Sequence, residues 1–100
     1  MNMQQMIAQA QKMQRELQKA QAQLAEKEFT VSKGGAVTVV VKGDKSIVSI
    51  SVDADAFDKD NKEMVEEMIV LAINEAHEQI DAASEEINER ITGRAGGMGF

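Results

Sequence analysis

The stretch from Asn61 to Ile91 contains neither proline nor glycine, and it constrains the fold more than any other feature of the sequence. Apolar residues recur along it at three- and four-residue steps, which predicts one helix: Val65, Ile69, Ala72, Ala76, Ile80, Ala83, Ile87 and Ile91. Such a helix is roughly 45 Å long, whereas a compact domain of this size has a radius of gyration of about 13 Å. We therefore expect its outer half, with Ile80, Ile87 and Ile91, to be bare in a single chain.

The first 26 residues carry a second helical pattern. Their apolar positions alternate steps of three and four, as in the seam of a coiled coil: Met3, Met6, Ala10, Met13, Leu17, Ala20 and Leu24. The stripe can pack on the rest of the chain or on a second chain, and the spacing leaves both alternatives open. A second copy of the chain would cover the apolar stripes that both helices expose. The predicted dimer interface therefore contains Met6, Met13, Leu17, Ile80 and Ile87.

Between the helices the pattern changes to a period of two, which is typical of strands with one buried face. Val37, Val39 and Val41 share a face, and so do Val48, Ile50 and Val52. The polar segment 43–46 predicts a hairpin turn, with Gly43 able to adopt a positive φ. Val40 and Ile47 fall on the polar face, where we expect them to pair across the hairpin. Residues 28–53 thus predict a three-stranded antiparallel meander.

These patterns predict one α+β domain over residues 1–100. Its parts are an N-terminal helix (1–26), the sheet (28–53), a C-terminal helix (60–92) and a flexible glycine-rich tail (93–100). Asp60 and Glu63 have the spacing of a capping box, so we expect Asp60 to cap the second helix. Because each helix is longer than a compact domain, the predicted assembly is an intertwined homodimer.

Catalytic and metal-binding patterns are missing from the sequence. It has no cysteine and a single histidine, His77, so thiolate sites and histidine clusters are excluded. The acidic segment from Asp53 to Asp60 fails the spacing of a calcium loop, and the glycines after Gly93 lack the Lys-Ser/Thr of a phosphate loop. We therefore predict a non-enzyme with no metal, cofactor or small-molecule substrate.

No apolar run approaches the ~18 residues of a membrane span, and no signal-peptide pattern opens the chain. The expectation is a cytoplasmic protein without a membrane partner.

Charge is distributed unevenly along the chain. The net charge is −6, yet residues 1–25 hold three basic side chains against one acidic one. Lys12, Arg15 and Lys19 follow i, i+3, i+7 spacing, which places them on one helix face. That face can be an ordinary solvated surface, or it can be a ridge that contacts phosphates, with neighbouring glutamines adding neutral contacts.

The order of these elements, together with particular strings, resembles the YbaB/EbfC family of bacterial nucleoid-associated proteins. The strings are Met3-Gln4-Gln5-Met6, Gly34 to Val39, Val48 to Asp53, and Asp60 to Ala76. The resemblance covers nearly the whole chain. It implies a tweezer-like homodimer with protruding helices that binds double-stranded DNA with little sequence preference and helps to organise the nucleoid.

The DNA contacts expected under this resemblance are Lys12, Arg15 and Lys19, with Arg90 and Arg94 near the other helix end. A second hypothesis is a prefoldin-like holdase or coiled-coil adaptor, because methionine-rich seams can grip apolar clients. Client protection without DNA retardation would favour it.

Overall fold

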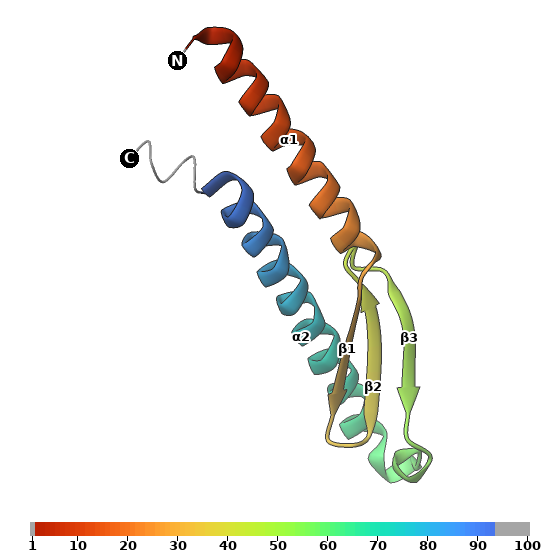
Figure 1. Ribbon diagram of the computed structural model, residues 1–100. Helices are drawn as coiled ribbons and strands as arrows, with labels where there is room; N and C mark the ends of the chain where they lie inside the picture. Colours follow the sequence, from red (N-terminus) through yellow and green to blue (C-terminus); the bar gives the residue numbers. More distant parts are fainter. Residues whose placement is uncertain (1, 94–100) are drawn as a thin grey trace.

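The computed structural model describes residues 2–93, so most of the predicted tail lies outside the described residues. The C-terminal long helix packs on one face of a sheet, and the N-terminal long helix extends beyond the end of that sheet (Figure 1). The elements are α1 (Met3–Glu26), β1 (Glu28–Lys33), β2 (Val37–Lys42), β3 (Ile47–Val52) and α2 (Lys62–Asn88). This order confirms the predicted α+β class and the three-stranded meander.

Helix α1 begins with a side-chain cap and ends abruptly. The Asn2 carboxamide oxygen accepts a hydrogen bond from the Gln5 amide at 2.8 Å, which satisfies one of the amides exposed at a helix start. At the other end Lys27 adopts extended backbone angles (φ −72°, ψ 139°). A single residue therefore converts α1 into β1, and the helix direction is tied closely to the sheet.

The sheet has the order β1-β2-β3, with both neighbouring pairs antiparallel. Val39 of the central strand pairs with Val31 on one side and Ile50 on the other. The inner valines of β2 are at most 1% exposed, and Ala72 and Ala76 of α2 are fully buried. These small side chains let α2 lie close to the valines, which creates the apolar core.

The β2–β3 hairpin differs from the prediction at two points. A bulge between the pairs Val40–Ser49 and Val41–Ile47 leaves Val48 as the extra residue. Ile47 therefore lies opposite Val41 and does not pair with Val40. In the turn it is Lys45, not Gly43, that has a positive φ (74°).

The start of α2 also differs from the prediction. Two short 3-10 turns, Ala54–Ala56 and Lys59–Asn61, precede the helix, and the Asp58 carboxylate accepts from the Asp60 amide. Asn61 occupies the cap position without a side-chain hydrogen bond. The Asp60 capping box was therefore wrong, because Asp60 is itself held inside the second turn. After Asn88 the backbone continues in a π-helical turn, Glu89–Gly93.

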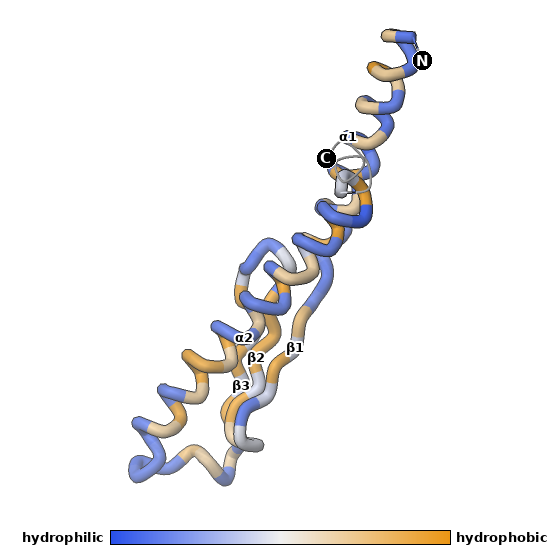
Figure 2. Tube along the Cα trace, turned by 90° about the vertical axis from the view of Figure 1, so that its left-hand side faces the viewer, coloured by the Kyte–Doolittle hydropathy of each residue, from blue (hydrophilic) through white to orange (hydrophobic). Residues whose placement is uncertain are grey.

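The molecule is elongated, with extents of 69 × 25 × 14 Å and a radius of gyration of 19.6 Å. That radius exceeds the ~13 Å of a compact chain of this length. Above the sheet α1 and α2 run side by side in opposite directions, and α1 projects past the end of α2 (Figure 1). Figure 2 shows the most apolar stretches where α2 faces the strands, whereas α1 is mixed along its length.

The outer half of α2 is covered within the chain. Ile80 is 3% exposed and Ile87 is 9% exposed, and Ile91 is partly buried, so the expectation that all three are bare in a single chain was wrong. Ile80 belongs to the core beneath the sheet, and Ile87 lies beside Ala20 and Leu24 of α1. Helix α1 therefore covers part of the α2 surface that we expected a second chain to cover.

Candidate nucleic-acid interface

The three basic residues of α1 lie on the part of the helix that rises above the sheet. We call Lys12, Arg15 and Lys19 the α1 ridge. All three side chains are exposed, and their spacing keeps them on one face of a continuous helix. The helix therefore presents its positive charge along one side of a projecting arm.

The cations of the α1 ridge form no ion pair with a carboxylate within residues 2–93, although Glu16 lies on the same stretch of helix. Four lysines elsewhere are paired with carboxylates at 2.8–2.9 Å: Lys33 with Glu75, Lys42 with Glu26, Lys45 with Asp81, and Lys62 with Glu66. None of the ridge residues forms such a pair in that part of the chain. Its charges therefore remain available to an external anion.

Neutral hydrogen-bonding groups lie next to the ridge toward the N-terminus. Gln5, Ala8, Gln9 and Lys12 line a shallow surface hollow on α1. The first acidic residue of the chain is Glu16. Amide donors beside a lysine suit contacts with phosphate and sugar oxygens, which fix a protein on a duplex without reading its sequence.

The opposite helix is acidic. Residues 62–93 contain two basic and nine acidic side chains, a difference of −7. Arg90 lines the hollow between the two helices together with Gln23, Lys27 and Glu86, so it lies near α1 but beside a carboxylate. Arg94 lies outside the described residues. The structure thus places Arg90, one of the two further candidates for DNA contact, close to the arm that carries the ridge.

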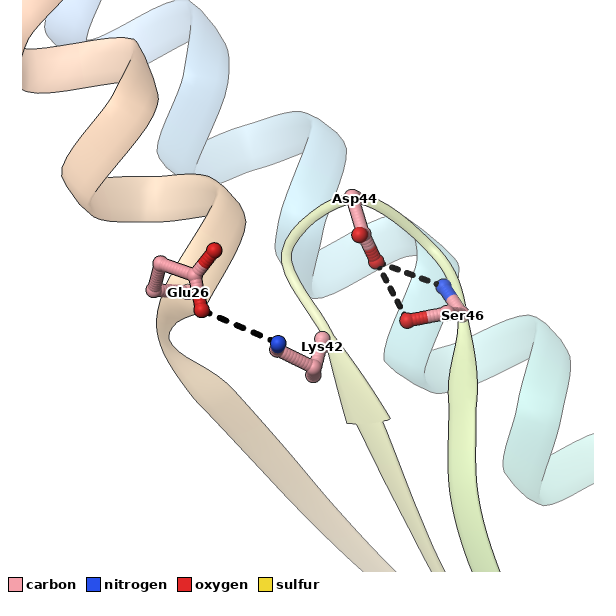
Figure 3. Close-up of polar contacts among 4 residues, drawn as sticks. All are labelled: Glu26, Lys42, Asp44 and Ser46. Atoms are coloured by element: carbon pink, nitrogen blue, oxygen red, sulfur yellow. Dashed lines mark hydrogen bonds and ion pairs between the residues drawn. The ribbon is translucent and has the colours of Figure 1, made fainter.

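A set of contacts around the β2–β3 hairpin fixes the direction of the arm (Figure 3). Glu26, the last residue of α1, pairs with Lys42 at 2.9 Å, and this hydrogen bond and ion pair raise the pKa of Lys42. Hydrogen bonds from the Ser46 hydroxyl and amide hold the Asp44 carboxylate and lower its pKa. The hairpin is therefore ordered where it meets the helix.

Gly43 lets the hairpin approach the end of α1. Its amide donates to the Lys27 carbonyl at 2.8 Å, and a Cβ at this position would collide with the Leu24 carbonyl. Further along, the Gln21 amide nitrogen contacts the Asn88 side chain at 3.2 Å. The sequence signal was a glycine in the turn, but we assigned it to turn conformation and missed this close approach.

The described residues were also searched for a metal site, a catalytic histidine and a membrane span. No three His, Asp or Glu side chains within residues 2–93 are grouped so that they could hold a metal ion. His77 has a buried Nε2 atom that lacks a hydrogen-bond partner in this part of the chain, and it is the single histidine of the sequence. Over the same residues, no helix is long and apolar enough to cross a membrane.

A cationic arm that projects from an otherwise acidic molecule is typical of proteins that meet a polyanion at one end. The features on α1 are those expected of a small α+β protein of the nucleic-acid-binding class. The chain belongs to the YbaB/EbfC DNA-binding family, whose family model matches residues 1–95. This is a family of DNA-binding proteins and not of enzymes.

Relatives agree with this assignment, and a solved structure has the same fold. A nucleoid-associated protein of Clostridium novyi is 43% identical over 94 residues, which is 93% of this chain and 82% of the relative. Another, from Agathobacter rectalis, is 44% identical over 97 residues, covering 96% and 86%. The crystal structure of an uncharacterized Helicobacter pylori protein matches 90% of this chain and 96% of its own with a TM-score of 0.72. At 19% identity, that likeness concerns the fold alone.

Proposed function

We propose that this protein binds duplex DNA with little sequence preference and acts at the nucleoid as a homodimer. The observation that carries the proposal is the α1 ridge: three exposed cations on a projecting helix, without a carboxylate partner among residues 2–93. Relatives across the whole chain carry the name nucleoid-associated protein, which supports the same function here.

Phosphate contact accounts for binding that does not depend on sequence. Lysine and arginine that neutralise phosphates release condensed counterions, and this term supplies most of the affinity of non-specific binders. A homodimer doubles the ridge to six cations. The acidic surface of α2 repels DNA, so contact is confined to the arm and we expect micromolar affinity or weaker at physiological salt.

The surface proposed for dimerisation is the edge strand β3, on the same face of the sheet that α2 covers over β1 and β2. The inner positions of β3 remain half exposed: Ile47 49%, Val48 49% and Ile50 44%. Ile50 and Ile47 lie opposite the buried Val39 and Val41, so they share the face that α2 covers on the neighbouring strands. On the adjacent flank of α2, Val70 is 56% exposed. A second copy would remove this apolar surface from water.

The side chains that the sequence predicted for the dimer interface differ in how exposed they are. Ile80 and Ile87 are buried by their own chain, and Met13 and Leu17 are partly buried. Met6 remains 57% exposed at the end of α1. The surface that lacks a cover within the chain is therefore β3 with its flanking residues, and we place the interface there.

DNA binding is tested by retardation of a 30-base-pair duplex in low salt. Neutralising the ridge with Lys12→Gln, Arg15→Gln and Lys19→Gln should abolish retardation, since these exposed side chains make no ion pair among residues 2–93. The matched control Lys45→Gln, Lys59→Gln, Lys62→Gln makes the same change in net charge away from α1 and should bind as wild type does. Equal binding by both variants would show that the ridge is only a solvated face.

Dimerisation is tested by sedimentation equilibrium at micromolar protein. We expect twice the chain mass of 10.9 kDa, and Ile50→Asp should shift the protein toward the monomer because a charge would enter the buried face. Ser51→Asp, on the opposite face of the same strand, should leave the mass unchanged. A stable wild-type monomer would contradict the dimer.

The exposed apolar residues also keep the holdase hypothesis testable. If wild type fails to retard DNA at low salt and suppresses aggregation of an unfolded protein at stoichiometric ratios, the DNA proposal is wrong and the holdase replaces it.

A further inference from the structure

Within residues 2–93, the hydrogen bonds between α1 and α2 all involve one side chain of α1, that of Gln21. Its Nε2 atom donates to the Asn88 Oδ1 atom at 3.2 Å and to the Ser84 carbonyl oxygen at 3.4 Å. Its Oε1 atom accepts from the Ser84 hydroxyl at 3.3 Å. One side chain of the arm thus binds two residues of the opposite helix, and we call these contacts the Gln21 clamp.

The other contacts between the two helices are apolar. They come from small or aliphatic side chains: Ala20, Leu24, Ala83 and Ile87. Such contacts have no preferred direction, and a hollow separates the helices on the flank that holds Gln23 and Glu86. Residues two apart on a helix do not share a face, so Gln21 lies on the other flank of α1 from Gln23. Within residues 2–93 the clamp therefore supplies the directional contacts between α1 and α2.

Helix α1 has a second point of support at its C-terminal end. Lys27 alone connects it to β1, and the Gly43 amide donates to the Lys27 carbonyl at 2.8 Å. One attachment makes a pivot, and the clamp adds the second attachment that fixes the direction of the helix. Lys12 lies roughly 22 Å from Lys27 at 1.5 Å per residue, so a tilt of about 15° moves it by roughly 6 Å.

A shift of that size matters for contacts with phosphates. Successive phosphates of one strand are about 3.4 Å apart along the axis of a duplex. A change in the direction of α1 therefore changes which phosphates the α1 ridge can meet. An arm that already has the correct direction also loses less freedom when it binds.

We propose that Gln21 is a positioning residue for DNA binding, which sets the direction of the arm through its hydrogen bonds to Ser84 and Asn88. The inference rests on the proposed DNA binding and adds a residue that acts through the placement of others. At 3.6 residues per turn, Gln21 lies nearly opposite Lys12 and Lys19 on α1. Its side chain therefore faces α2, while the α1 ridge faces away from it.

The test compares Gln21→Met with the matched control Gln18→Met. Methionine keeps the length of the side chain and favours helix, but it cannot form the hydrogen bonds of the clamp. Gln18 is exposed, so the control makes the same change without loss of the clamp. In fluorescence anisotropy with a labelled duplex at low salt, Gln21→Met should bind about fivefold more weakly, and Gln18→Met should bind as wild type does.

The direction of the arm is measured separately by pulsed EPR. The chain has no cysteine, so Ala8→Cys on α1 and Thr30→Cys on β1 provide one pair of spin labels at exposed positions. Labelled chains are refolded with an excess of unlabelled chains, so that only distances within one chain are recorded. The distance distribution should be about twice as broad with Gln21→Met as in wild type, and it should be unchanged with Gln18→Met.

The α2 side of the clamp provides a second variant. Ser84→Ala, Asn88→Ala removes the side-chain partners of Gln21 from the helix that lacks the ridge. It should broaden the distance distribution and weaken DNA binding as Gln21→Met does. Adding Gln21→Met to it should cause little further loss, because residues that share one set of contacts are not additive.

Each outcome separates positioning from the proposed function. If Gln21→Met binds DNA as wild type does, or if it binds more weakly with an unchanged distance distribution, Gln21 does not position the ridge and DNA binding stands. Full additivity of the α1 and α2 variants would also overturn the clamp. If wild type does not bind DNA at low salt, the proposed function fails and the positioning role fails with it.

Discussion

The sheet region and the projecting arm are held in place by different means. In the sheet region, Val37, Val39 and Val41 are at most 1% exposed beneath Ala72 and Ala76 of α2. In the arm, α1 packs on the end of α2 and the turn that follows it, and its first two turns expose Met3, Met6 and Ile7. Stability therefore resides in the half that lacks the ridge, and the half that carries the ridge can present its side chains to a ligand.

The largest expected effect is on the free energy of unfolding, and it appears when one isoleucine is truncated in each region. Ile80→Ala should lower the free energy of unfolding by about 2–4 kcal/mol, because it leaves a cavity in the core. Ile7→Ala should change it by less than about 0.5 kcal/mol, since the side chain is exposed. Urea denaturation at one protein concentration measures both. Similar losses for the two variants would mean that the arm is packed as tightly as the sheet region.

A second prediction concerns the junction between the regions. Gly43→Ala places a methyl group against the Leu24 carbonyl, so we expect a loss of about 1–3 kcal/mol. Gly35→Asn is the control: its Cβ would meet nothing within 4 Å, and asparagine tolerates the positive φ of 66°. A neutral Gly43→Ala variant would show that α1 is not tied to the hairpin by this approach.

The smallest expected effect is the pH dependence of the hairpin contacts. The lowered pKa of Asp44 adds stability above the ordinary aspartate pKa of about 3.9, and this is lost as the pH falls through the folded value. The raised pKa of Lys42 adds stability below about pH 10.4, and this is lost as the pH rises through the folded value. Between about pH 5 and 9 both contributions are constant.

Asp44→Asn should therefore lower the urea midpoint at pH 7 and leave it close to wild type at pH 2. Lys42→Gln should also lower the urea midpoint at pH 7, and this difference should fade at alkaline pH as the pH rises through the raised pKa of Lys42. A difference for Asp44→Asn that persists at pH 2 would contradict the charge-based account and indicate a loss of packing in the turn.

The two regions were predicted from the sequence to different extents. The apolar period changes from helical to alternating and back again, and this change predicted the order of the helices and strands because each element buries one face. The bulge at Val48 was not visible, since it is an interruption of strand pairing and leaves the alternation of Val48, Ile50 and Val52 intact. The start of α2 was misassigned because several Asp and Asn side chains compete for the same capping role.

Tertiary contacts account for the remaining differences. The spacing of the α1 seam could not decide between its own chain and a second one, and Ile87 beside Leu24 shows that part of the seam packs within the chain. The exposure of Lys12, Arg15 and Lys19 followed from helix spacing. Their lack of ion partners did not, because three of the four ion pairs join segments far apart in sequence, as with Lys33 and Glu75.

The central claim is that the α1 ridge holds DNA phosphates, and the salt dependence of binding tests it most directly. Fluorescence anisotropy of a labelled duplex should give a plot of log K against log salt with a slope of about −5, since a dimer that neutralises six phosphates has a slope of about −0.9 for each. Exchanging Lys19 alone for glutamine should bring the slope to about −3.6, because two contacts are lost from each dimer. A slope near zero for wild type, or an unchanged slope for Lys19→Gln, would contradict the account.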